Sequence, residues 1–406
     1  MCSSDLVNKK GKVSNGNYLW ISYFYSYLNK TGRAGFVMSS QASSAGRDEA
    51  KVRQKLIETG DVDIMIAIRT NFFYTRTVPC ELWFLNRNKT KEHQNKVLML
   101  DARDIFRKVT RKIYDFSREQ LQNLLAVVWL YRGQQDRFIN LVASYIAQTL
   151  DEARSCFETG GGGGKIIHPL PDYVAALADL MRTMGHFLDS LPKDAAHVEV
   201  LSQLDEESRN FEQEMNTFSA TIEVEAAQWE KQLRDNTALR EAIERLAPLS
   251  EASRDLIKQA DLVYKLACRL IEVCEDQLSA KENNLWVSRE VVRARKAADE
   301  ARQIAVEQLK QVRYFHKQAA WLIERFPDAS LRDVEGLVKL VNRADLEVND
   351  WSLTPGRYVG VAPLEEDDGF DFEEALRDIQ IELEGLNVEA VELAAKIRKN
   401  FEDLGV

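Results

Sequence analysis

The chain has 406 residues, of which 45% are hydrophobic and 29% charged, a composition typical of a globular protein with two or three domains. Its most apolar early stretch, residues 18–28, has about half the length of a membrane-spanning helix and contains serines, so we expect no membrane span. The five cysteines are scattered without a C-x-x-C pair, and the five histidines lack metal-ligand spacing. This pattern argues against a metal site and favours reduced thiols in a cytoplasmic protein.

Charge is distributed unevenly along the chain. Residues 1–135 contain 22 Lys and Arg against 12 Asp and Glu, whereas the whole chain has a net charge of −10. A basic first third is what contact with phosphate groups would require. Ordinary surface charge accounts for the same numbers equally well, so both interpretations stay open on charge alone.

The first 68 residues alternate between helical and strand patterns. The predicted elements are a helix from Asn17 with Trp20, Ile21, Phe24, Tyr25 and Leu28 on one face, a strand at 35–38, a serine-rich loop at 39–46, a helix at 48–58 and a strand at 62–68. Gly60 follows the second helix, where a left-handed residue often ends a helix. The run at 62–68 is continuously apolar, which is typical of a strand covered on both faces.

Two more strands are predicted at 80–85 and 97–100, and Ser117 to Gln120 has the form of a capping box that opens a helix ending near Arg132. Strand, helix and strand at this spacing indicate a parallel sheet with crossover helices. The last two strands have no helix between them, so we expect one of them to run antiparallel at the edge. Residues 7–135 therefore read as part of an open α/β sheet.

Beyond residue 135 the pattern is helical. The glycine run 160–164 is interpreted as a flexible linker, because Lys165 is not followed by Ser or Thr as a phosphate-binding loop would require. From 172 to 344 we expect long helical hairpins or coiled coil, with stops at Pro192, Pro248 and Pro327. The predicted domains are thus 7–135, 136–344 and 345–406, the last with a turn-rich break before a final helix.

Ordered motifs in the α/β part resemble a known family. They are NYLW at 17–20, GRAGFV at 32–37, LIETGDVD at 56–63 and FFYTRTVPCELWFL at 72–85, and DWSLTPGRYV follows at 350–359. In this order and spacing they are similar to the back half of N6-adenine DNA methyltransferases, and above all to the modification (M) subunit of type I restriction–modification systems. The resemblance covers about 17–133 and 345–406.

The resemblance implies an enzyme that transfers a methyl group from S-adenosylmethionine to N6 of an adenine in DNA. Such chemistry requires the adenine to leave the duplex and to be held by stacking. In the family, an Asn-Pro-Pro-Phe/Tyr motif holds the exocyclic nitrogen, and a glycine-rich turn after an earlier strand binds the cofactor. The chain contains no Pro-Pro dipeptide, and no strand–G-x-G–helix unit precedes residue 17. We therefore expect an N-terminally truncated, inactive fragment, with the end of a Rossmann-like sheet and no cofactor-binding residues of its own.

What remains of the expected site is the far wall of the base pocket. By resemblance, Phe73 and Tyr74 are the candidates for stacking on the flipped base, although aromatic residues at strand ends also pack in cores. Arg76 is a weaker candidate for a phosphate contact, since a solvated loop arginine explains it as well. The loop at 39–46 lies where open α/β sheets place ligands, and it is either a DNA contact or a plain loop.

The last helix is predicted to dock a partner. Apolar residues recur with steps of three and four over about four heptads, at Leu376, Ile379, Leu383, Leu386, Ala390, Leu393 and Ile397, followed by Asn400 and Leu404. The alternative is that this helix folds back on the chain's own helices. The resemblance implies DNA, a specificity subunit and a restriction subunit as partners. Two other hypotheses are a solitary adenine methyltransferase and a non-enzymatic coiled-coil interaction protein.

Overall fold

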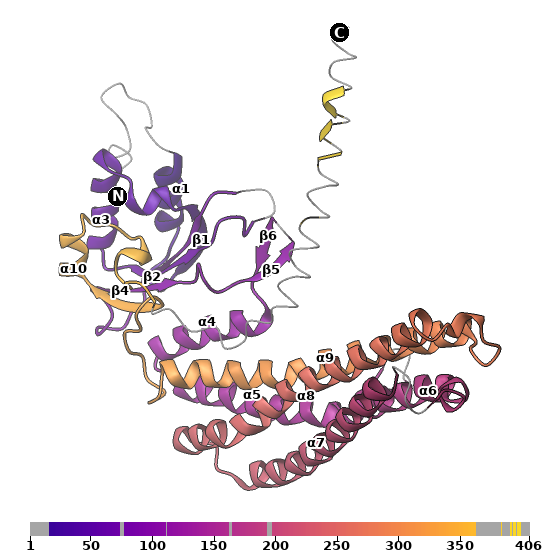
Figure 1. The fold of residues 1–406 in the computed structure, drawn as a ribbon. Helices are drawn as coiled ribbons and strands as arrows, with labels where there is room; N and C mark the ends of the chain where they lie inside the picture. Colours follow the sequence, from indigo (N-terminus) through magenta and orange to yellow (C-terminus); the bar gives the residue numbers. More distant parts are fainter. Residues whose placement is uncertain are drawn as a thin grey trace. The chain divides into compact units, whose positions relative to one another are not determined.

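A computed structural model describes residues 16–73, 77–110, 112–161, 165–192 and 197–362, together with residues 383, 390, 391, 393, 394 and 396–398 (Figure 1). The chain forms two compact units. Unit 1 comprises residues 1–121 and 332–406, and unit 2 comprises residues 122–331. The units divide after residues 121 and 331. The boundaries predicted from the sequence, at 135 and 344, lie 14 and 13 residues later in the chain. None of the helices within the described ranges is long and apolar enough to cross a membrane.

Unit 1 is a mixed α/β structure. In chain order its elements are α1 (Gly16–Ser26), β1 (Arg33–Ser39), α2 (Gln41–Ser44), α3 (Arg47–Glu58), β2 (Val62–Ile68), β3 (Cys80–Asn86), β4 (Lys96–Asp101), β5 (Arg107–Thr110), β6 (Ile113–Asp115), β9 (Val338–Asn342), α10 (Arg343–Val348) and the 3-10 turn η4 (Pro355–Arg357). The predicted strands and the helix over 48–58 are confirmed. Gly60 has the expected positive φ of 79°, and all seven residues of β2 are buried.

The main sheet has the order β1-β3-β2-β4-β9. β2 and β4 are parallel, while β3 runs antiparallel to both β1 and β2. The expectation of an antiparallel strand is therefore correct, but its place at the edge is wrong. The crossover through α3 leaves room for one strand between β1 and β2, and β3 fills it. β9, which the sequence analysis took for helix, adds an antiparallel strand beside β4.

Two local expectations in unit 1 need correction. On α1 the buried residues are Tyr18, Ile21 and Tyr25, whereas Trp20 is 57% exposed, so the buried face is rotated from the predicted one. The serine-rich segment 39–46 is not a plain loop, because it contains the short helix α2 with Ala42 and Ser43 buried.

Unit 2 consists of long helices packed side by side (Figure 1). Its elements are most of α4 (Arg118–Tyr131), α5 (Gln135–Ser155), β7 (Thr159–Gly160), β8 (Ile166–Ile167), α6 (Pro169–Asp189), α7 (His197–Lys231), α8 (Asn236–Asp276), the 3-10 turn η3 (Ala280–Glu282) and α9 (Ser288–Arg325). The predicted capping box of α4 is confirmed, since Ser117 and Gln120 exchange hydrogen bonds between side chain and backbone.

Two breaks predicted in the helical region differ from the structure. Helix α8 continues through Pro248, although proline removes a backbone donor. The glycine run also begins inside structure rather than in a linker, because Gly160 belongs to β7, which pairs with β8.

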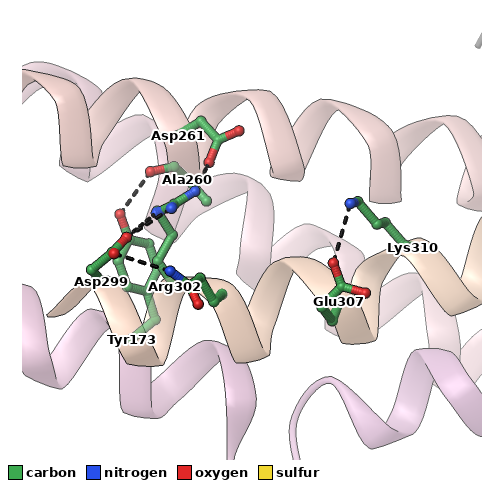
Figure 2. Close-up of polar contacts among 8 residues, drawn as sticks. Tyr173, Ala260, Asp261, Asp299, Arg302, Glu307 and Lys310 are labelled. Carbon is green, nitrogen blue, oxygen red and sulfur yellow. Dashed lines mark hydrogen bonds and ion pairs between the residues drawn. The ribbon is translucent and has the colours of Figure 1, made fainter. Parts of the chain in front are cut away.

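A polar network connects three helices of unit 2 (Figure 2). Arg302 of α9 binds Asp299 on its own helix at 2.7 Å and Asp261 of α8, and its guanidinium lies 5.1 Å from the ring centre of Tyr264. Nearby, Tyr173 of α6 donates a 2.7 Å hydrogen bond to the Ala260 carbonyl. Because partly buried charges are costly to leave unpaired, this network favours one alignment of α6, α8 and α9.

Candidate functional site

The carboxyl ends of β1, β2 and β4 meet at one edge of the sheet, together with the start of the antiparallel strand β3. Open α/β sheets bind their ligands at this edge. The segment after β1 carries α2, the segment after β2 carries Arg69 to Phe73, and β4 ends in Asp101. The candidate site is therefore built from these three segments and from Glu81 near the start of β3.

Arg53 fixes the segment after β1. This arginine of α3 is only 2% exposed. Its Nη1 donates hydrogen bonds to the Tyr18 hydroxyl at 3.0 Å and to the Ala45 carbonyl at 2.7 Å, and Tyr18 itself donates to the Ala42 carbonyl. The guanidinium, through its hydrogen bonds, thus satisfies buried oxygen atoms that would otherwise be costly to desolvate.

The same arginine anchors residues 350–359, the late motif of the sequence. Arg53 Nε donates to the Trp351 carbonyl at 2.6 Å, and both Asp350 and Trp351 have positive φ, at 53° and 55°. Such a turn is strained for residues other than glycine, and the bond to Arg53 helps to hold it. The predicted turn-rich break is thereby confirmed, and its role is to close unit 1.

Thr354 and Leu353 continue this attachment at α2. The hydroxyl oxygens of Ser43 and Thr354 lie 2.7 Å apart, and the Leu353 amide donates to the Ser43 carbonyl at 2.9 Å. Gly356 packs on the Asp101–Arg103 ion pair so closely that a Cβ atom there would lie 2.7 Å from Arg103 Nη2. The late motif therefore covers the carboxyl edge next to β1 and β4.

Glu81 is the buried carboxyl group of this edge. Its side chain is 1% exposed, and Oε2 has no hydrogen-bond partner among the described residues. Burial, with a contribution from Asp101, raises the pKa of Glu81 to about 8, while Ser43, Arg103 and Arg53 act in the opposite direction. Glu81 therefore keeps its proton at pH values at which an ordinary carboxyl group has lost it.

The aromatic wall lies after β2. The rings of Phe72 and Phe116 have centroids 4.4 Å apart, and Phe73 meets Phe72 edge-on at 6.0 Å. Both Phe72 and Phe73 are half-buried, and Phe72 packs against the rings on either side of it. Tyr74 and Arg76, the other residues singled out from the sequence, lie outside the described residues.

Sequence reasoning missed Arg53, Glu81 and Arg69. Arg69, directly after β2, packs against two rings, with its guanidinium carbon 4.0 Å from the ring centre of Phe106 and 4.3 Å from that of Tyr114. Glu81 and Arg69 could have been proposed as site residues from one feature of the sequence, namely a charged residue inside or directly after an apolar run. Within the described part of the chain, no group of three or more His, Cys, Asp and Glu side chains is placed to hold a metal ion.

The arrangement does not fit S-adenosylmethionine. The residues that follow the described strands at this edge are a short helix, the aromatic wall and Ala102-Arg103, and none is the glycine-rich turn that cofactor phosphates or carboxylates approach closely. An open hollow of about 480 Å³ after β1 is lined by Gln41, Ser44, Ala45, Gly46, Arg47 and Glu49.

Comparison with known proteins matches the first third of the chain. Residues 6–149 match the family described as N-6 DNA Methylase. The MjaIX methylase subunit of a type I restriction enzyme from Methanocaldococcus jannaschii is 30% identical over 149 residues, which cover 36% of this chain and 27% of the relative. The HindI methylase subunit from Haemophilus influenzae is 25% identical over 142 residues, 35% of this chain and 31% of the relative.

The chain thus aligns with less than a third of the length of these curated relatives. Among solved structures, the type I restriction-modification system methyltransferase subunit from Streptococcus thermophilus is 21% identical over 28% of this chain and 23% of that chain, with a TM-score of 0.26. A likeness of that extent supports no argument about the fold.

Proposed function

We propose that this chain is part of the methylation subunit of a type I restriction–modification system, because residues 6–149 match the N-6 DNA Methylase family. The complete subunit would transfer a methyl group from S-adenosylmethionine to N6 of adenine in DNA. The observation that supports this most strongly is that two curated type I methylase subunits align over about the same length of chain. The sheet order β1-β3-β2 is then the end of a Rossmann-like methyltransferase sheet.

Within that function, this chain would supply one wall of the site for the extruded adenine. A base that leaves the duplex needs an apolar surface to stack on. Phe73 is half-buried and packs edge-on against Phe72, which in turn packs against Phe116. We assign base stacking to Phe73 together with Tyr74, the next residue.

The chain would not bind the methyl donor by itself. Its sequence has no Pro-Pro dipeptide, and no glycine-rich turn follows the described strands at the carboxyl edge. The donor site and the group that holds the adenine N6 must then come from another polypeptide segment. The long helices of unit 2 would serve as an arm that docks other subunits, and DNA, a specificity subunit and a restriction subunit are the proposed partners.

Two measurements test this function. Calorimetric titration of the full chain with S-adenosylmethionine should give no saturable binding. Transfer of tritiated methyl groups to DNA should then appear only when the chain is combined with its cognate specificity subunit and with a polypeptide that carries the donor-binding half of a type I methylase. Saturable binding of S-adenosylmethionine by the chain alone would contradict the proposal that the donor site lies in another polypeptide segment. Failure of the chain to assemble with either protein would contradict the function itself.

A further inference from the structure

The two-stranded ribbon formed by β5 and β6 stands outside the main sheet. All four residues of β5 are exposed, and so is Lys112 at the turn. Residues 107–115, which span the ribbon, contain four Lys and Arg against one acidic residue, Asp115. Asp115 accepts two hydrogen bonds from Arg107, at 2.9 and 2.7 Å, which leaves the ribbon with a clear positive excess.

The ribbon is held firmly at its base. An isolated two-stranded hairpin is at best marginally stable in water, but here Phe106 and Tyr114 both pack against the Arg69 guanidinium. Their own rings meet edge-on at 5.1 Å. The Tyr114 amide donates to the Asn71 carbonyl at 3.2 Å, and Gln120 Nε2 donates to the Phe106 carbonyl at 2.8 Å. These contacts fix the ribbon next to the segment that carries Phe72 and Phe73.

Lys108 of β5 and Lys112 at the turn are both exposed to solvent. A solvated strand can carry lysines simply to block pairing with other chains, but such a strand does not need the aromatic support and the bidentate ion pair that hold this one. A rigid basic β-ribbon is a shape that enters the major groove of a duplex, about 12 Å wide. Its charge is complementary to the phosphate backbone.

We propose that the β5–β6 ribbon binds the phosphate backbone of duplex DNA beside the aromatic wall at Phe73. Lys108 and Lys112 contact phosphate oxygens, while Arg107 keeps the two strands in register through Asp115. The identity of the nucleic acid as DNA rests on the proposed function. The ribbon thereby positions the duplex so that an extruded base meets the wall.

The test is the salt dependence of DNA binding by the full chain. Fluorescence anisotropy with a labelled 25-base-pair duplex is recorded from 50 to 200 mM salt. For the double variant Lys108→Ala, Lys112→Ala we expect at least tenfold weaker binding at 50 mM salt. We also expect the slope of log affinity against log salt concentration to be shallower by about 2, because each lost phosphate contact removes about 0.9 from it. Lys108→Arg, Lys112→Arg keeps both charges and should bind like the parent.

The matched control is Lys51→Ala, Lys55→Ala, which removes two exposed cations from α3 of the same unit and should leave both affinity and slope unchanged. If the parent binds the duplex and the ribbon variant binds it equally well with the same slope, the ribbon is not the contact. A loss as large in the α3 control would also overturn it, because the effect would then be one of net charge. A parent that binds no duplex at any salt concentration contradicts the proposed function as well.

Discussion

At the scale of single residues, Glu81 makes the stability of unit 1 depend on pH. The folded protein holds this proton up to a pKa of about 8, against an ordinary value of 4.5. Between these two values the folded state binds more protons than the unfolded chain, so the free energy of unfolding falls as the pH rises from about 4.5 to about 8. Above pH 8 both states are ionised, and the loss is complete.

Glu81→Gln, which is neutral at every pH, should remove this loss. At pH 8 we expect the variant to be more stable than the parent, by at most roughly 5 kcal/mol if the whole shift counts, and near pH 4.5 the two should be similar. Urea unfolding at pH 5, 6, 7 and 8 measures the difference. Glu92→Gln, at an exposed position, is the control and should follow the parent. Parallel stability curves for Glu81→Gln and the parent would show that Glu81 does not carry the effect.

The residues of the candidate site were only partly predictable. The wall at Phe73 could be proposed because its neighbours in the sequence form a motif. Arg53 could not, because the carbonyl oxygen of Trp351 that it binds lies 298 positions further along the chain. Periodicity and spacing in a sequence depend only on residues within a few turns or strands of one another. From the sequence, a buried arginine whose partners come from both ends of the chain cannot be distinguished from any charged residue on a helix.

At the scale of elements, β1 is the exposed edge of the main sheet. Among the described residues it pairs only with β3. Val37, in the middle of β1, is 45% exposed. An unpaired apolar edge offers backbone groups to strands of other molecules, so the isolated chain should associate as its concentration rises.

Val37→Lys should reduce this association several-fold, because a lysine on an edge strand must lose its hydration when another strand pairs beside it. Light scattering of the full chain at increasing concentration measures it. Val78→Lys makes the same change at a similarly exposed site outside the strands, where the valine is 47% exposed, and should have little effect. Equal association of the parent and Val37→Lys would mean that β1 is not the contact.

Helices and strands that are defined by a local sequence pattern were predicted well, but the order of the strands in the sheet was not. The apolar run of β2 and the helix that ends before Gly60 depend on a few neighbouring residues. The insertion of β3 between β1 and β2, and the pairing of β9 with β4, depend on which strands meet. β9 pairs residues 338–342 with residues 96–100, and no pattern within either segment specifies the other.

At the scale of the whole molecule, unit 1 is completed by a segment that follows unit 2 in the chain. Residues 332–362 add β9, α10 and the late motif to the sheet, and Val341, Leu346 and Leu353 are buried in its core. The helical unit is therefore an insertion between two parts of one α/β unit. This explains why the late motif belongs with the early ones, although more than 200 residues separate them.

The final segment of the chain carries the predicted surface for docking a partner protein. Of the predicted heptad seam, Leu383, Ala390, Leu393 and Ile397 are described, and all four are helical and exposed. Leu383, Leu393 and Ile397 are 55%, 57% and 48% exposed. Leu376, Ile379, Leu386, Asn400 and Leu404 lie outside the described residues. Apolar side chains that recur at this spacing and face water are typical of a helix that packs on another helix.

We therefore expect Leu383→Asp combined with Leu393→Asp to abolish co-purification with the cognate specificity subunit, because the interface would have to bury two unpaired carboxylates. The measurement is affinity co-purification, with helix content followed by circular dichroism. Val388→Asp with Val391→Asp places the same two charges off the seam and should leave co-purification intact. If the seam variant is retained as well as the parent at unchanged helix content, the docking surface lies elsewhere, and the helices of unit 2 become the place to look for it.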